Sequence, residues 1–185
     1  AVRDLDLPGT IGLAHSRSNS GGDVNWSHPF IACDDSLAYI ANGSRGFFKD
    51  AFDANATACA LEASGHRYTA LSDGAISSYP VLTDGRCLHI SDVMAHAIEE
   101  RLNGGHDPLE AIEGAFVDLP AEIVGLFIAP SHPDRIFGAR YTMPMCVATD
   151  AGGSRIASSP TAFPVECAWE WVPPGSVVTI DQHGF

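Results

Sequence analysis

The sequence predicts an α+β fold, with antiparallel sheets that carry helices on their outer faces. Two observations favour this class: strands joined by short turns occur in groups, and two strongly periodic helices separate those groups. The length of 185 residues fits a single domain, over 1–185, with a sizeable core. Hydrophobic residues make up 45% of the chain and charged residues 18%, which is typical of a globular protein and not of a disordered one.

The first half of the chain is predicted to consist of short strands and loops with one helix. Apolar runs bounded by Asp, Ser and Gly indicate a strand that ends in a polar loop, and then a hairpin. Apolar residues at partial helical spacing, followed by Gly65, indicate the helix. The predicted elements are a strand over 11–17, a loop over 18–26, a hairpin of 30–33 and 37–41, a helix over 47–63, and an irregular excursion or short hairpin over 68–86.

The second half begins with two clearer helices and continues as strands. One helix runs from Asp92 to Leu102, because its apolar residues share one face, and Ser91 or Asp92 can cap it. Another helix, over 108–119, has Asp107 as its cap and proline at its first position. The strands predicted after these helices are 123–129, 135–140, 143–148, 154–157, 167–172 and 176–180.

The charge of the chain argues against several classes of partner. The net charge is −13, and Lys49 is the only lysine. Such a surface repels phosphate backbones and anionic membranes, so neither a nucleic-acid partner nor membrane association is predicted. No run approaches the ~18 apolar residues of a membrane span, and the start has no apolar signal-peptide segment.

The cysteines and histidines show no spacing that is typical of a metal site. Five scattered cysteines without a C-x-x-C pair are typical of reduced thiols, which favours the cytoplasm. The histidines other than His15 and His28 have no metal-ligand spacing among themselves. The sequence therefore predicts no metal and no cofactor.

The residues of chemical interest lie in three segments. They are Gly12-Leu13-Ala14-His15-Ser16-Arg17 followed by His28-Pro29, then Asn42-Gly43 at the end of a strand, and then Asp92 at the head of a helix. In this order they resemble the class II glutamine amidotransferases, which share a G-x-A-H-x-R segment, a histidine–proline, an asparagine–glycine and an aspartate at a helix start. Residues 138–145 and 171–180 resemble that family's A-R-x-x-x-P-L stretch and its closing strand pair. The resemblance extends from about Ile11 to Ile180.

Within this family the spacing most resembles the glutaminase domain of glucosamine-6-phosphate synthase, also called glutamine–fructose-6-phosphate amidotransferase. The resemblance implies the αββα four-layer sandwich of N-terminal-nucleophile hydrolases, here without its first strand or strands. It also implies a domain that binds L-glutamine and, when complete, hydrolyses the side-chain amide to supply ammonia to a sugar phosphate such as fructose 6-phosphate. That acceptor would lie on a sugar-isomerase-type domain or on a partner subunit, and a homodimer is compatible with the resemblance.

A free amino acid needs a fixed cation for its carboxylate and a fixed anion for its ammonium. Arg17 offers a planar fork for the carboxylate, and Asp92 can accept from the ammonium. A surface arginine and a plain helix cap are the alternatives. By resemblance, Ser18, Ser20 and His28 also contact the substrate, although a structural histidine bonded to the backbone explains His28 equally well.

Amide hydrolysis also needs donors directed at the oxyanion of the tetrahedral intermediate. By resemblance, the side chain of Asn42 and the backbone N–H of Gly43 supply them. Glycine permits close approach of the backbone and a positive φ. The alternative is an Asn-Gly turn that joins two strands.

The sequence departs from the family at the nucleophile. The family uses a cysteine at the mature N-terminus, whose α-amine acts as the base for the thiol. Here the first residue is Ala1, and the family's R-W-x-T-H-G loop is replaced by the sequence R-S-N-S-G-G. None of the five internal cysteines has a free amine, so we expect that the nucleophile segment is absent and that this chain alone does not hydrolyse glutamine.

Two other functions remain open at this point. One is a non-catalytic amino-acid-binding or interaction domain that has lost the nucleophile. The other is an N-terminal-nucleophile amide hydrolase that is not specific for glutamine.

Overall fold

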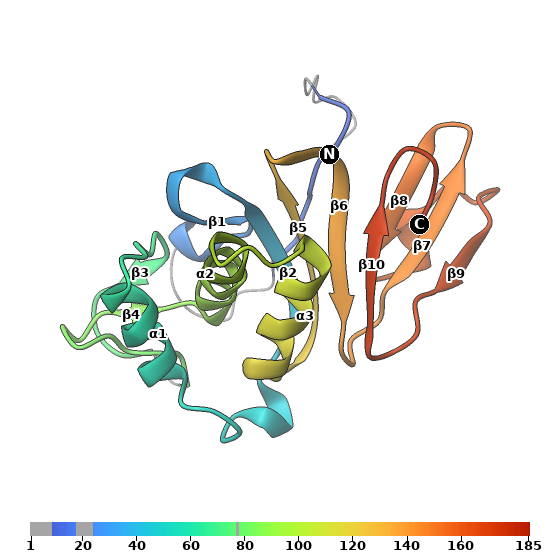
Figure 1. Ribbon diagram of the computed structural model, residues 1–185. Helices are drawn as coiled ribbons and strands as arrows, with labels where there is room; N and C mark the ends of the chain where they lie inside the picture. Colours follow the sequence, from blue (N-terminus) through green and yellow to red (C-terminus); the bar gives the residue numbers. More distant parts are fainter. Residues whose placement is uncertain (1–8, 18–23, 77) are drawn as a thin grey trace.

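The computed structural model describes residues 9–17, 24–76 and 78–185. Its main feature is a five-stranded antiparallel sheet with the strand order β1-β2-β5-β6-β10 (Figure 1). A smaller sheet has the order β8-β7-β9, and β3 pairs with β4. The strands are β1 (Phe30–Ile31), β2 (Ala38–Ser44), β3 (Leu71–Ser72), β4 (Cys87–Leu88), β5 (Glu122–Ala129), β6 (His132–Arg140), β7 (Cys146–Asp150), β8 (Gly153–Ala157), β9 (Trp169–Trp171) and β10 (Ser176–Ile180).

The helices lie on one side of the large sheet, and the small sheet lies on the other (Figure 1). Helix α2 (Ile90–Asn103) packs against β1 and β2, helix α3 (Pro108–Asp118) packs against β6 and β10, and helix α1 (Ala54–Ala63) contacts α2. The α+β class is therefore confirmed. The described part of the chain supplies three layers of the predicted αββα sandwich: helices, large sheet and small sheet. Short 3-10 helices occur at Val24–Trp26, Cys33–Asp35, Gly46–Phe48 and Pro160–Ala162.

Strand β5 shows how the sequence builds two cores on one sheet. Successive side chains of a strand point to opposite faces. Ile123 and Phe127 face the helices and belong to the larger core. Val124 lies in the second core, between the sheets, with Leu126 and Ile128 packed against it. Both faces are covered, so β5 is almost wholly apolar instead of alternating with polar residues.

Local capping explains where two of the helices begin. The side chain of Asp107 accepts from the backbone N–H of Leu109 at 2.9 Å, and Glu110 completes a capping box, so the predicted start of α3 is confirmed. Helix α1 begins at Ala54, not near residue 47 as predicted. Asp53 caps it there by accepting from two backbone N–H groups at 3.0 Å each.

The predicted strand over residues 11–17 is wrong, because the structure assigns no strand to that segment. Its side chains nevertheless alternate between half-buried and exposed positions. Ile11 and Leu13 pack against the core between the two sheets. The prediction was based on the apolar start and polar end of the segment, but within the described residues it pairs with no strand.

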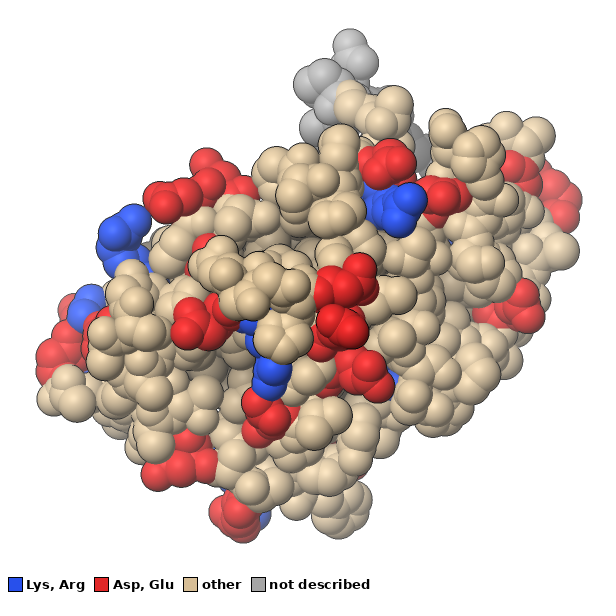
Figure 2. Space-filling view, viewed as in Figure 1, with Lys and Arg blue, Asp and Glu red and all other residues tan. Residues whose placement is uncertain are grey.

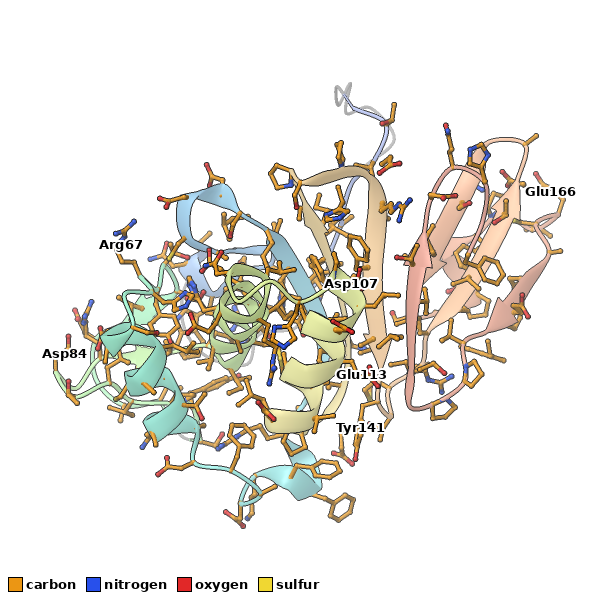
Figure 3. All side chains as sticks on the ribbon, viewed as in Figure 1. Arg67, Asp84, Asp107, Glu113, Tyr141 and Glu166 are labelled. Carbon is orange, nitrogen blue, oxygen red and sulfur yellow. The ribbon has the colours of Figure 1, made fainter. Side chains whose placement is uncertain are left out.

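On the face shown in Figure 2, the acidic residues occur at several separate places instead of forming one patch. Four acidic residues labelled in Figure 3 are exposed: Asp107 and Glu113 at helix α3, and Asp84 and Glu166 in loops. The net charge of −13 comes from 23 Asp and Glu against 10 Lys and Arg, and the acidic groups named here are solvated. None of the helices in residues 9–17, 24–76 and 78–185 is long and apolar enough to cross a membrane.

The three tryptophans occupy contrasting environments. Trp26 is 0% exposed in the core on the helical side of the sheet. Trp169 and Trp171, on strand β9, are 43% and 48% exposed. The rings of these two meet edge to face with centroids 5.2 Å apart.

Candidate functional site

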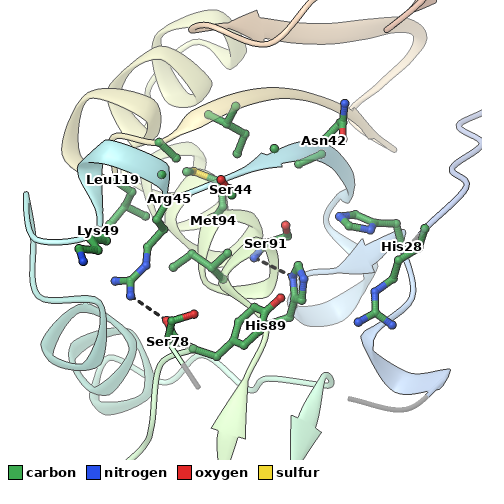
Figure 4. A pocket seen from close by; sticks show the side chains of 18 of the residues that line it. His28, Asn42, Ser44, Arg45, Lys49, Ser78, His89, Ser91, Met94 and Leu119 are labelled. Atoms are coloured by element: carbon green, nitrogen blue, oxygen red, sulfur yellow. Dashed lines mark hydrogen bonds between the residues drawn. The ribbon is translucent and has the colours of Figure 1, made fainter. Parts of the chain in front are cut away.

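A cavity of about 390 Å³ opens between the end of β2 and the start of α2 (Figure 4). Its lining brings together residues from five separate segments, near positions 15–17, 28, 41–52, 78–79 and 89–94, with further apolar side chains from around 119–123. Four of the residues predicted from the sequence line it: Arg17, His28, Asn42 and Gly43. Segments far apart in the sequence thus converge on one site.

Strand β2 carries Asn42 and Gly43 to the edge of the cavity. In the register of the sheet, Asn42 is opposite Val124 and Gly43 is opposite Ile123. Gly43 has φ of +141°, and a Cβ there would lie 2.0 Å from the backbone oxygen of Glu122. The structure therefore gives a packing reason for glycine here: the backbones of β2 and β5 approach so closely that no side chain fits. The predicted role of its N–H at the oxyanion stays a prediction.

Three imidazoles, those of His15, His28 and His89, share the cavity. The rings of His15 and His28 have centroids 4.0 Å apart, and those of His28 and His89 are 5.6 Å apart. Burial, the neighbouring imidazoles and the charge of Arg17 lower the pKa of His28 to about 3. Burial, Arg17 and His15 lower the pKa of His89 to about 4, and burial also lowers that of His15. All three imidazoles are therefore neutral near pH 7.

His89 has a second role as the cap of helix α2. Its Nδ1 accepts from the backbone N–H of Ser91 at 3.1 Å, as drawn in Figure 4. Its ring stacks on that of Phe30, with centroids 4.9 Å apart. The prediction that Ser91 or Asp92 caps the helix is therefore wrong. A neutral imidazole can serve as the acceptor, whereas an imidazolium has no lone pair to offer.

The lowered pKa of His89 predicts that the protein loses stability in mild acid. Between the pKa in the unfolded chain, about 6.5, and about 4 in the folded chain, only the unfolded state binds the proton. The free energy of unfolding therefore falls as the pH falls through this window, by about 2 kcal/mol at pH 5 for this one group. Denaturant unfolding at pH 8 and pH 5 measures the loss.

The variant His89→Asn isolates this contribution, because asparagine caps a helix but does not titrate. We expect it to lose less stability than the wild type between pH 8 and pH 5. His106→Gln, which alters an exposed histidine, serves as the matched control and should behave like the wild type. An identical loss in His89→Asn and the wild type would contradict the assignment.

The fixed charges of the described lining are all positive. Arg17, Arg45 and Lys49 line the cavity, and they are three of the ten Lys and Arg residues in a chain with a net charge of −13. No Asp or Glu occurs among the described residues of the lining. Arg45 is held in place by donating from Nη2 to the backbone oxygen of Ser78 at 2.7 Å (Figure 4). A ligand with a carboxylate or another anionic group fits this lining electrostatically.

Asp92 lies outside this lining. It is 0% exposed, and its Oδ2 accepts from the backbone N–H groups of Thr69 at 3.2 Å and Ala70 at 2.9 Å. Its Oδ1 lies 3.4 Å from Nε2 of His96. The carboxylate is thus directed at protein groups, and its predicted contact with a ligand ammonium stays a prediction. Ser18 and Ser20 lie outside the described residues.

Three residues of the site were not predicted from the sequence: Arg45, Lys49 and His89. Arg45 and Lys49 follow Asn42-Gly43 closely along the chain, so their position after the strand was the available signal. His89 immediately precedes helix α2, whose start was predicted at Asp92, so it was not considered as a residue of the site. All five cysteines are described, and none of them lines the cavity.

The sequence is similar to that of glutamine–fructose-6-phosphate aminotransferases of the isomerizing kind, although no family model matches it. It is 26% identical to the protein of Zymomonas mobilis over 181 residues, which are 96% of this chain and 26% of that protein. It is 28% identical to the protein of Aeropyrum pernix over 162 residues, which are 85% of this chain and 22% of that protein. The chain thus spans about a quarter of the length of these curated relatives.

Two solved structures share the fold. Glutamine phosphoribosylpyrophosphate amidotransferase from B. subtilis matches with a TM-score of 0.62 at 19% identity, over 92% of this chain and 32% of that chain. A structure described as the allosteric regulatory enzyme of purine biosynthesis matches with a TM-score of 0.59 at 19% identity, over 89% and 31%. The fold is that of the N-terminal-nucleophile glutamine amidotransferases. In sequence, the chain resembles glucosamine-6-phosphate synthase.

Proposed function

We propose that this chain is a glutaminase domain whose cavity binds L-glutamine and positions the side-chain amide for hydrolysis. The observation that carries the proposal is the convergence of Arg17, His28, Asn42 and Gly43 on one cavity, since the order of motifs alone predicted each of them. The similarity to glutamine-dependent aminotransferases supports the same substrate.

The cationic lining sets the orientation of the substrate in this proposal. Arg17 receives the α-carboxylate of glutamine through its planar guanidinium, which matches the two carboxylate oxygens. The imidazoles of His15 and His28 are neutral near pH 7, so the positive charge of the lining comes from Arg17, Arg45 and Lys49. The side-chain amide of glutamine then lies near the end of β2, by Asn42 and Gly43.

Hydrolysis in this site requires a nucleophile and donors for the oxyanion. A thiolate adds to the amide carbon, and the carbonyl oxygen becomes an oxyanion that accepts from the Asn42 side chain and the Gly43 backbone N–H. A proton passes to the amide nitrogen, the C–N bond breaks and ammonia leaves. Water then hydrolyses the thioester to glutamate and regenerates the thiol.

The thiolate in this mechanism is an N-terminal cysteine that the 185-residue sequence does not contain. The internal cysteines do not line the cavity, and burial raises the pKa of Cys33, Cys146 and Cys167, which disfavours their thiolates. We therefore propose that this chain alone releases no ammonia from glutamine. In a protein that supplies the cysteine, the ammonia would pass to a sugar-phosphate acceptor on another domain or on a partner subunit.

A second function is favoured by the same lining. It holds cations and hydrogen-bonding groups without a cysteine, which suits a domain that binds an amino acid and performs no chemistry on it. Ammonia release separates the two. The test uses a form of the domain to which a nucleophile segment with an N-terminal cysteine has been added. This form should hydrolyse glutamine if the domain is a glutaminase, and should only bind it if the domain is a binding module.

The test of the proposed substrate is the variant Arg17→Lys. Lysine keeps the charge but loses the two-pronged contact, so glutamine should bind at least tenfold more weakly, a loss of about 1.4 kcal/mol. Isothermal titration calorimetry with L-glutamine measures this. Arg135→Lys, on the exposed part of β6, is the matched control and should bind like the wild type.

Arg45→Lys distinguishes the two arginines of the cavity. If Arg45 holds the carboxylate, this variant will show the larger loss and Arg17→Lys will not. Wild-type affinity in Arg17→Lys would reject the assigned role. No glutamine binding by the wild-type chain would count against the proposed substrate itself.

A further inference from the structure

Four side chains from three distant parts of the chain meet beside helix α2, which carries two of them. They lie outside the cavity proposed to bind glutamine. They are Cys33 in the loop between β1 and β2, His66 just after α1, and His96 and Glu99 on α2. His96 is 0% exposed, Glu99 2% and His66 7%. None of the four lines the cavity described above.

The ligand atoms of these four side chains converge closely enough to surround one metal ion. Sγ of Cys33, Nδ1 of both histidines and a carboxylate oxygen of Glu99 all lie within 4.8 Å of one another. Nδ1 of His66 is 3.2 Å from Nδ1 of His96 and 2.7 Å from Oε2 of Glu99. Nδ1 of His96 is 3.1 Å from the same Oε2 and 3.8 Å from Sγ of Cys33. A tetrahedral zinc with bonds of about 2.0–2.3 Å separates its ligand atoms by roughly 3.3–3.7 Å.

Each of the four side chains also has a neighbouring protein group that does not occupy the site of the metal. The atom that would bind the metal therefore stays available. Nε2 of His66 lies 2.8 Å from Oε2 of Glu100, and Nε2 of His96 lies 3.4 Å from Oδ1 of Asp92. The hydroxyl of Ser36 donates to Oε1 of Glu99 at 2.5 Å. The backbone N–H of Arg67 donates to Sγ of Cys33 at 3.3 Å. Such outer contacts from carboxylates and backbone groups orient the ligands of protein metal sites.

The outer partners of the two rings lie beside the Nε2 atoms, away from the atoms that converge. An imidazole that carries its proton on Nε2 has a bare lone pair on Nδ1. The Nδ1 atoms of His66 and His96 and the Oε2 of Glu99 lie about 3 Å from one another. Acceptor atoms this close need a proton or a metal cation between them. Three carboxylates, of Asp92, Glu99 and Glu100, surround the pair of rings and favour a divalent cation.

We propose that Cys33, His66, His96 and Glu99 form a structural zinc site. One thiolate, two imidazoles and one carboxylate form a ligand set of intermediate softness that suits Zn²⁺, and four protein ligands close the tetrahedron without an open position for substrate. Binding displaces the thiol proton of Cys33, and no electron is transferred.

The site would join three segments that are distant from one another in the sequence. It ties the β1–β2 loop and the turn after α1 to the middle of α2. The same helix supplies Ile90, Ser91 and Met94 to the glutamine cavity. Zinc would therefore stabilise the wall of the cavity without taking part in its chemistry.

The metal content of the purified protein tests this proposal independently of glutamine. Mass-spectrometric metal analysis of the 185-residue chain, after equilibration with Zn²⁺ and gel filtration, should find about one zinc per chain. X-ray absorption should show one sulfur and three nitrogen or oxygen neighbours. Removal of zinc by a strong chelator should lower the melting temperature, and added Zn²⁺ should restore it.

Two variants show whether the metal lies at this site. Cys33→Ser and Glu99→Gln should each weaken zinc binding roughly 100-fold, and Cys33→Ser should abolish the sulfur-to-metal absorption band of the cobalt-substituted protein. Cys59→Ser changes a half-buried cysteine of α1 outside the cluster and should bind zinc like the wild type. Circular dichroism confirms that each variant is folded.

Two results would overturn the proposal. One is a wild-type chain that retains neither Zn²⁺ nor Co²⁺ at micromolar concentration, which would leave the cluster as a network of protonated histidines and carboxylates. The other is wild-type zinc affinity in both folded variants, which would place the metal elsewhere.

Discussion

Replacing Asn42 by alanine is expected to lower kcat for glutamine hydrolysis about 10²-fold, with little change in KM, in a form of the domain that begins with a cysteine. The amide of Asn42 lines the cavity at the end of β2, beside the backbone of Gly43. In the proposed mechanism it donates to an oxyanion that exists only after the thiolate has attacked. Its loss therefore raises the barrier without weakening the binding of the ground state. Steady-state kinetics of ammonia release measure both parameters.

Asn103→Ala is the control for this substitution, because Asn103 is an exposed amide at the end of α2. It should leave both kinetic parameters unchanged. If Asn42→Ala raises KM and leaves kcat as it is, Asn42 is a binding residue, and the oxyanion must be stabilised by other groups.

Gly43→Ala is expected to lower the free energy of unfolding by on the order of 3 kcal/mol. Two costs add: a backbone φ of +141° that L-residues rarely adopt, and a Cβ placed 2.0 Å from the backbone oxygen of Glu122. Strands β2 and β5 must separate at this point to admit a methyl group. For a chain of this length, the loss corresponds to a fall in melting temperature of roughly 6–12 °C.

Gly65→Ala separates the two costs. Gly65 also has a positive φ, of +109°, but a Cβ there would meet nothing within 4 Å. The variant Gly65→Ala should therefore lower the free energy of unfolding only by the cost of backbone strain, about 1 kcal/mol. Equal losses in the two variants, measured by urea unfolding, would show that the contact between β2 and β5 relaxes at little cost.

The sequence allowed the second half of the fold to be predicted well because its signals are local. The capping box of Asp107 and Glu110 and the apolar face of α2 depend on neighbours along the chain. The segment 11–17 was predicted as a strand because it begins apolar and turns polar, yet strand pairing depends on a distant partner. Likewise His89, not Ser91 or Asp92, caps α2, since the aromatic contacts that orient its ring come from other segments.

The candidate site was predictable only as far as its motifs keep a recognisable order. Arg17, Asn42 and Gly43 were found in this way. Arg45 follows them closely in the sequence, but its contacts with Ser78 and Phe52, which hold it at the cavity, come from later residues of the chain. The ligands of the proposed zinc site were missed for the same reason. Only His96 and Glu99, one helical turn apart, carried a local signal.

The contrast between the tryptophans gives the protein a built-in optical reporter. Trp26 is fully buried, and its ring meets those of Tyr79 and His89 at 4.7 and 5.5 Å, so its emission should lie at short wavelength and be shielded from iodide. Trp169 and Trp171 are open to solvent on β9, so iodide should quench their emission. The iodide-resistant fraction of the fluorescence therefore follows the wall of the cavity, and the quenchable fraction follows the small sheet. A single fluorescence experiment with iodide can thus distinguish local loosening around the site from unfolding of the whole chain.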